Sequence, residues 1–169
     1  MLDTKKLVTV GLLIAIDVVL TRFFSFQTPI VRLTFNFIAI AVTGALYGPL
    51  TAGIAAALAD IIGMLLFPYG TFFPGFTLSA FLRGAAYGAI FHNRKIDIKS
   101  IILASAIVAF VIGLGITSLW LNMTTGTPYF KLVQVRAIPN LITFGAQVLI
   151  LSVILDRIVK TGKSILKSY

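Results

Sequence analysis

Charged side chains inside apolar stretches are the residues of this sequence that could do chemistry. Asp17, Asp60 and Arg83 each stand within a run of apolar residues. A charge near the centre of a bilayer costs about 2.5–3.5 kcal/mol on insertion scales, so each of these residues needs a partner or a function. One interpretation is an ion pair of Arg83 with Asp60 or Asp17 that fixes helix register. Ligand binding is compatible with such pairing and is the second interpretation.

A second set of charges is entirely basic. Arg22, Arg32, Lys131 and Arg136 lie near one predicted boundary of the membrane, in a half of the chain's predicted bundle that contains no acidic residue. Snorkelling of long side chains to the interface accounts for one or two of them. The remaining positive charge is most simply explained by an anionic ligand, because charges at membrane depth need compensation.

Aromatic residues gather at the same predicted boundary. An interfacial belt favours Trp and Tyr, whereas this set is dominated by Phe at positions beside Pro and Gly. It therefore favours a pocket for a flat heteroaromatic ring, in which each stacked pair adds about 0.5–1.5 kcal/mol. The set consists of Phe23, Phe24, Phe26, Phe35, Phe37, Phe67, Tyr69, Phe72, Phe73, Phe76, Trp120, Tyr129 and Phe130.

The sequence carries no recognisable catalytic or metal-binding set. It has no Cys and a single His, His92, which is predicted as an interface residue at a helix end. It contains no Gly-rich phosphate loop, no HExxH pair and no close pair of carboxylates, so nucleotide hydrolysis is not predicted. We therefore expect a binding protein rather than an enzyme, with no cofactor and no metal.

Membrane helices must position these residues. The chain is 59% hydrophobic and 11% charged, whereas soluble domains carry about 25% charged residues. Its net charge of +9 is not arranged as the basic, aromatic-interleaved surface that would bind nucleic acid. Because a spanning helix needs about 20 apolar residues, Gly and Pro punctuation predicts an all-α integral membrane protein with six transmembrane helices in one bundle. They are predicted at about 7–24, 34–47, 50–67, 76–92, 100–121 and 133–159, within a single domain over residues 1–169.

The distribution of Lys and Arg predicts the orientation of this bundle. Nine of these residues fall on the side of the two termini and four on the other. Because cytoplasmic loops carry the excess of Lys and Arg, both termini are predicted to be cytoplasmic, in a multi-pass protein of the cell membrane. The loops at 25–33, 68–75 and 122–131 then face outside, where a binding lid would be built.

Three stretches of the sequence resemble the substrate-binding S components of energy-coupling factor (ECF) vitamin transporters, and specifically the folate-specific members. The stretch "FFPGFTLSAFLRG" is the most specific part of the resemblance, which covers nearly the whole chain. The three stretches are "GLLIAIDVVLTRFFSFQTPIVRLTFNFIAIAVTGALYGPLTAGIAAALADIIG", "LLFPYGTFFPGFTLSAFLRGAAYG" and "VRAIPNLITFGAQ".

The resemblance implies a small membrane protein that captures its vitamin from outside and associates with a transmembrane coupling subunit and two ATPase subunits, which supply the energy. The S component is thought to topple within the membrane to deliver the vitamin. In this family a small-xxx-small pair on the first helix, typically Ala-xxx-Ala, contacts the coupling subunit. The matching residues here are Gly11 and Ala15, and glycine also permits close approach of helices.

Folate, the ligand that the resemblance implies, carries a flat pterin with an amide-plus-amino edge. The donors of that edge suit a carboxylate acceptor. We therefore expect Asp60, with Asn36 or Asn140, to read the pterin, and we expect Phe73 and Phe76 to stack on it.

The glutamate tail of folate carries two carboxylates. The guanidinium fork matches a carboxylate in geometry and charge, so Arg22, Arg32 or Arg136 is expected to hold the tail. Arg83 is expected to orient Asp60 or to touch the ring.

Alternatives remain at the level of the sequence. The nearest alternative is an S component for another vitamin. Thiamine is cationic and would need acidic residues, which this half of the predicted bundle lacks. Riboflavin is uncharged and would leave the arginines unexplained, and biotin has one carboxylate and no extended aromatic plane. A membrane-embedded enzyme acting on an anionic lipid or prenyl phosphate would need clustered acids or a nucleophile–base pair, and neither is present. A channel or an anion-binding structural subunit is a third class.

Overall fold

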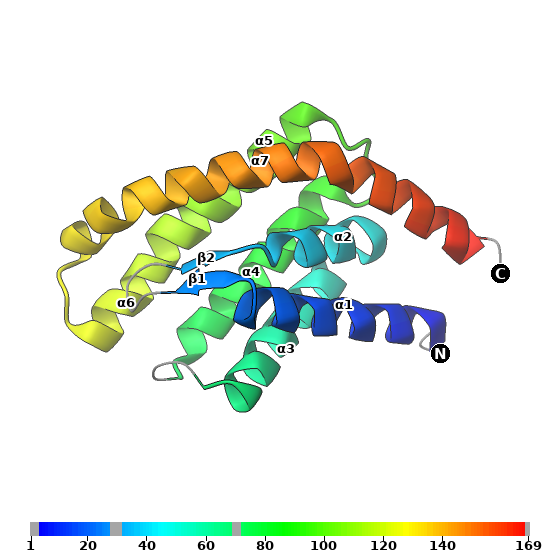
Figure 1. The fold of residues 1–169 in the computed structure, drawn as a ribbon. Helices are drawn as coiled ribbons and strands as arrows, with labels where there is room; N and C mark the ends of the chain where they lie inside the picture. The colour runs from blue at the N-terminus through cyan, green and yellow to red at the C-terminus, as the bar shows by residue number, and fades with distance from the viewer. Residues whose placement is uncertain (1–3, 28–31, 69–71, 168–169) are drawn as a thin grey trace.

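The computed structural model describes residues 4–27, 32–68 and 72–167 of the chain. In these ranges the chain forms a bundle of long helices (Figure 1), which confirms the prediction of an all-α bundle with six helical spans. The elements are α1 (Thr4–Arg22), β1 (Ser25–Gln27), β2 (Arg32–Thr34), α2 (Phe37–Tyr47), α3 (Pro49–Leu66), α4 (Pro74–Phe91), α5 (Ile98–Ala106), η1 (Ile107–Ile116), α6 (Thr117–Thr125) and α7 (Tyr129–Lys167).

The fifth predicted span, at 100–121, is one continuous helix that changes its winding. It begins as α5, continues as the π-helix η1 and ends as α6. Asp97 begins this helix with a capping box: its carboxylate accepts from the Ser100 N–H, and the Ser100 hydroxyl accepts from the Asp97 N–H. The last predicted span, at 133–159, is the long helix α7, which contains Pro139 in its interior.

The segment at 25–33, expected to be a loop, contains a short β-hairpin instead. β1 and β2 pair antiparallel, with Ser25 opposite Thr34 and Gln27 opposite Arg32. The sequence signal for such short strands is weak, because three residues are too few for an alternating pattern to stand out. The hairpin follows α1 directly, and β2 contacts α7.

Helix α4 is the centre of the bundle and packs against α2, α3, α5, η1 and α6. Glycine permits its closest contacts. A Cβ atom at Gly44 of α2 would lie 2.7 Å from the Gly88 nitrogen of α4, and one at Gly84 would lie 2.8 Å from the Gly53 nitrogen of α3. These backbones touch because no side chain separates them, which is how small residues pack helices in lipid.

The remaining apolar surface fits a membrane protein. A buried cluster at the centre includes Tyr87 and Phe91, whose rings stack at 5.7 Å, whereas many large apolar side chains, such as Leu65 and Ile138, point outward. By length and composition, three helical stretches could cross a membrane: Pro49–Leu66, Ile98–Thr125 and Tyr129–Gly162.

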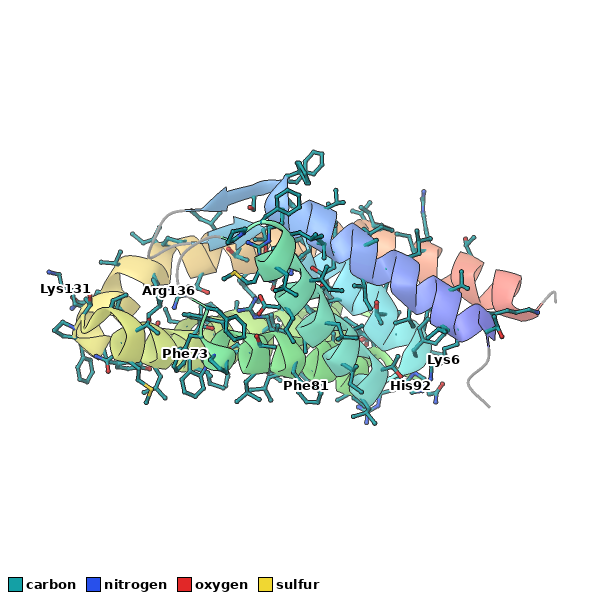
Figure 2. The ribbon with its side chains drawn as sticks, turned by 90° about the horizontal axis from the view of Figure 1, so that it is seen from below. Lys6, Phe73, Phe81, His92, Lys131 and Arg136 are labelled. Carbon is teal, nitrogen blue, oxygen red and sulfur yellow. The ribbon has the colours of Figure 1, made fainter. Side chains whose placement is uncertain are left out.

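The bundle has two distinct ends. The beginning of α1 and the end of α7 lie together (Figure 1), and Lys6 and His92 mark this end in Figure 2, which we call the termini end. Lys131 and Arg136 lie at the opposite end, which we call the arginine end. Lys131 and Arg136, which are predicted to lie near one boundary of the membrane, therefore lie at the end opposite to Lys6.

Candidate functional site

Arg22 and Asp60 form one side of the candidate site, on α1 and α3. The Arg22 guanidinium packs on Gly63, where a Cβ would lie 2.8 Å from Nε. Its Nε and Nη2 atoms are buried and have no hydrogen-bond partner. The nearby Asp60 carboxylate interacts with Arg22 electrostatically, and its Oδ2 accepts a 2.8 Å hydrogen bond from the Thr77 hydroxyl of α4.

Arg83 stands between acidic and basic groups. It interacts electrostatically with Asp60 most strongly and with Asp17 more weakly. In the described part of the chain no salt bridge joins Asp60 to Arg83 or Arg22, and the interaction of Asp60 with each arginine is electrostatic. Arg83 also repels Arg136 through their like charges.

Arg136 is the most deeply buried of these arginines, with 7% of its surface exposed. Its Nη1 donates to the hydroxyl of Ser118 at 2.9 Å, and Ser118 itself is fully buried. The Nε atom is buried without a hydrogen-bond partner. A buried unpaired donor on a charged group is costly, so this nitrogen is a place where a ligand oxygen would be stabilised.

The two asparagines differ in their surroundings. Asn140 lies one turn after Arg136 on α7, and its Nδ2 donates to the Arg136 carbonyl oxygen at 2.9 Å. Asn36 precedes α2, and its Oδ1 accepts a 2.6 Å hydrogen bond from the Thr34 hydroxyl. Asn140 is therefore directly linked to an arginine of the cluster, whereas the contact described for Asn36 is local.

The aromatic part of the site centres on Phe73. Its ring meets Phe76 edge-on at 5.9 Å and meets Trp120 at 5.8 Å. Trp120 is fixed by a 3.0 Å hydrogen bond from its Nε1 to the buried Ser79 hydroxyl. A Cβ at Gly75 would collide with both the Phe73 and Trp120 rings, so glycine is what lets these rings meet. Figure 2 places Phe73 in the half of the bundle that also holds Arg136.

Hydrogen bonds, ring contacts and electrostatic interactions place most of the predicted residues in three groups. The first joins Arg22 and Asp60 to Thr77, the second joins Arg83 to Arg136, and the third joins Phe73 to Phe76 and Trp120. Arg32 lies in β2, and its side chain is outside the described part of the structure.

Sequence reasoning missed the small residues that hold the larger ones. Thr77 bonds Asp60, Ser79 bonds Trp120, and Ser118 bonds Arg136. Ser79 stands four residues before Arg83 on the same helix, a spacing that places both on one face. A Ser or Thr close to an ionisable residue of a membrane helix is the sequence signal for such supporting residues, because charges at membrane depth need hydrogen-bond partners.

The arrangement suits an anion with an aromatic part. Arg22, Arg83 and Arg136 bring three positive charges, whereas Asp17 and Asp60 bring two negative ones, which leaves the cluster net positive. In the described residues no group of three or more His, Asp or Glu side chains could hold a metal ion.

A comparison with known families matches almost the full chain. The profile of a family described as the ECF-type riboflavin transporter, S component, matches residues 1–160.

Two curated relatives and one solved structure are named for a different vitamin, folate. The chain is 39% identical over 151 residues to the folate transporter FolT of Clostridium novyi, covering 89% of this chain and 88% of the relative. It is 31% identical over 153 residues to the folate transporter FolT of Leuconostoc mesenteroides, covering 87% and 82%. A crystal structure of FolT bound with folic acid superposes with a TM-score of 0.83 at 40% identity, covering 88% of this chain and 90% of that one.

Proposed function

This chain belongs to the family of S components of ECF-type transporters, and we propose that it captures folate with high affinity from outside the cell and delivers it to an ECF-type, ATP-driven importer. Membership of this family confirms the resemblance found in the sequence. It also means a transport role in a membrane rather than an enzymatic one.

The arginine cluster is the single observation that carries the choice of ligand. Arg83 and Arg136 repel one another, and Arg136 retains a buried Nε with no hydrogen-bond partner. A carboxylate between or beside them would relieve the repulsion and accept that hydrogen bond. Folate supplies two carboxylates, and the relatives named above are folate transporters.

The pterin would lie deeper, against Asp60 and the aromatic residues. Asp60 already accepts from Thr77 through Oδ2, which fixes the carboxylate and leaves Oδ1 for the donors of the pterin edge. Asn36 would contribute to the same recognition, because the Asn140 side chain already donates to the Arg136 carbonyl oxygen. Phe73 and Phe76 would stack on the ring, because their edge-on pairing leaves ring faces for a third aromatic plane.

The tail would be held by Arg136, together with Arg22 or Arg32, through charge-assisted hydrogen bonds. Arg83 would orient Asp60, with which it interacts electrostatically. Binding folate and delivering it to the importer require no cofactor in this chain.

Delivery would involve a transmembrane coupling subunit and two ATPase subunits, with this chain spanning the cell membrane several times and both termini in the cytoplasm. Gly11 and Ala15 are exposed on α1, and a Cβ at Gly11 would meet nothing within 4 Å. Since both residues are exposed and Gly11 has open space at its Cβ position, they fit a close contact with the coupling subunit.

This interface can be tested apart from binding. We expect Gly11→Leu to abolish folate uptake by cells and co-purification with the coupling subunit, and to leave folate affinity of the isolated chain unchanged. Gly145→Leu is the matched control, because Gly145 on α7 also has open space around its Cβ position. Equal loss of uptake in both variants would argue against the interface.

A ligand titration tests the proposed function itself. Trp120 is the only tryptophan and touches Phe73, so a ligand at the site should change its fluorescence. With the purified chain in detergent we expect a submicromolar response to folate and none to thiamine. Riboflavin is the second candidate because the matching family profile is named for it. A response to riboflavin alone would replace folate by that ligand.

A further inference from the structure

The helix between α5 and α6 has an unusual winding next to the candidate site. η1 is a π-helix of 10 residues, Ile107–Ile116. π-helical winding is rare, mostly limited to single turns, and often found at functional sites. Here both the N–H and the hydroxyl of Thr117 donate to the carbonyl oxygen of Ile112, five residues earlier. The wide winding therefore extends to the residue immediately before Ser118.

Ser118, the second residue of α6, is the first of two residues of this continuous helix that contact α7 at the site. It is fully buried, and its hydroxyl accepts the 2.9 Å hydrogen bond from Nη1 of Arg136. Each turn of a π-helix contains more residues than a turn of an α-helix, so the winding changes which side of the helix Ser118 occupies. The position of the hydroxyl against α7 thus depends on the winding of η1.

Gly113 is the second contact. A Cβ at this position would lie 2.8 Å from Oδ1 of Asn140, so the Asn140 side chain fills the space that glycine leaves open. Asn140 in turn donates to the carbonyl oxygen of Arg136. Two residues of one helix, Gly113 and Ser118, therefore contact one turn of α7, which carries Arg136 and Asn140.

We propose that Ser118 and Gly113 are positioning residues that set the selectivity of this chain for the glutamate tail of its ligand. Ser118 holds one end of the Arg136 guanidinium, which leaves the unpartnered Nε for a carboxylate. Gly113 lets Asn140 sit beside Arg136 and support that turn of α7. This inference rests on the proposed folate binding. It adds to that proposal the residues that position Arg136 to select ligands with a glutamate tail.

The first test separates tail recognition from general stability. Folate and pteroate, which lacks the glutamate tail, are titrated against wild type, Ser118→Ala and Ser105→Ala. Ser105 is the control because it is also fully buried in the same continuous helix. An Arg136 guanidinium no longer held by Ser118 is expected to lose its hydrogen bond to the tail carboxylate, and losing such a bond to a charged group corresponds to roughly a 10-fold loss of affinity or more. We expect that loss for folate in Ser118→Ala, a smaller loss for pteroate, and an unchanged folate-to-pteroate ratio in Ser105→Ala.

The second test does not depend on Ser118→Ala folding well. Gly113→Ala pushes on the Asn140 side chain, whereas Gly115→Ala adds the same methyl group to the same π-helix at an ordinary 3.6 Å from its nearest neighbour. We expect Gly113→Ala to lower the folate-to-pteroate affinity ratio and Gly115→Ala to preserve it.

The outcomes distinguish the two proposals. If wild type binds no folate, the proposed function fails before any variant is compared. If wild type binds folate but neither Ser118→Ala nor Gly113→Ala lowers the folate-to-pteroate ratio, binding stands and the positioning role is overturned. An equal loss for both ligands in both variants would also overturn it, because a purely structural defect has that signature.

Discussion

Two kinds of contact around α4 are built on opposite principles. Where α4 packs on α2 and α3, the backbones meet at Gly44, Gly84 and Gly88, and this packing leaves no space for a methyl group. At the candidate site, Arg83 and Arg136 carry like charges that repel one another, and Arg136 retains a buried donor without a partner. One region is close-packed in the chain alone, and the other contains buried polar groups that a ligand would complete.

This difference indicates how a small membrane protein can hold costly charges. Buried unpaired donors destabilise the protein in which they lie, so other contacts must offset them. The glycine-mediated packing around α4 is the best candidate for that compensation, because α4 carries both Gly84 and Arg83 on adjacent positions. Changes at the glycine contacts and at the candidate site should therefore have different consequences, for stability in the first case and for binding in the second.

The largest effect is expected on stability, from substitutions at the glycine contacts. Gly84→Ala would drive a methyl group into the backbone of α3 at Ala52, and overpacking of this kind costs up to about 3 kcal/mol. We expect a clearly lower melting temperature in detergent and poor yield, measured beside Gly145→Ala. Gly145 has open space around it, so its variant should melt no lower than wild type. Similar melting of the two variants would contradict the packing account.

Arg136 should give the next largest effect, on binding. Arg136→Gln keeps a polar side chain but removes the charge, so a charge-assisted hydrogen bond of about 1.5–3 kcal/mol is lost. We expect folate affinity to fall by roughly 10- to 150-fold with a small change in melting temperature. Lys131→Gln, at an exposed basic residue of the same helix, should bind as wild type does. Equal affinities for all three proteins would remove Arg136 from the site.

Replacing Asp60 should cause a smaller loss of ligand affinity, and that loss should come from the contact with the pterin rather than from the contact with the tail. Asp60→Asn retains one oxygen acceptor and the Thr77 contact but loses the negative charge. We expect about a 10-fold weaker affinity for folate and pteroate alike. Asp156→Asn, at the exposed ion pair with Lys160, is the control. Full folate affinity in Asp60→Asn would refute the assignment of Asp60 to the pterin.

The smallest effect is expected at the capping box of α5, away from the arginine end. Hydrogen bonds from Ser100 lower the pKa of the exposed Asp97 carboxyl below its ordinary value. A lowered pKa in the folded state means that ionised Asp97 stabilises the fold at neutral pH, and that this contribution is lost as the pH falls through the lowered pKa. Asp97→Ala should melt slightly below wild type at pH 7, with the difference vanishing in acid and folate affinity unchanged.

Much of the fold could be predicted because membrane helices have strong sequence signals. Apolar runs separated by Gly and Pro define the spans, and small-xxx-small pairs such as Gly84 and Gly88 identify close contacts. The β-hairpin at 25–34 and the π-winding of η1 could not be predicted. Three-residue strands carry too little pattern, and a π-helix is chemically indistinguishable in sequence from an α-helix of the same apolar residues.

The candidate site was predictable in its charges but not in its supports. Arg83 and Asp60 stand out because ionisable residues are rare in such segments. Ser118 and Thr77 do not stand out, since a hydroxyl is common in a membrane helix and its role depends on which distant residue it meets. Only the packing of α6 on α7 and of α4 on α3 brings Ser118 to Arg136 and Thr77 to Asp60.

The most direct test of the central claim is a structure of this chain with folate bound. The account predicts that the pterin lies beside Asp60 and Phe73, and that a carboxylate of the glutamate tail accepts a hydrogen bond from Nε of Arg136. A folate molecule bound at the termini end, or one at the arginine end whose tail carboxylates contact no arginine, would contradict it.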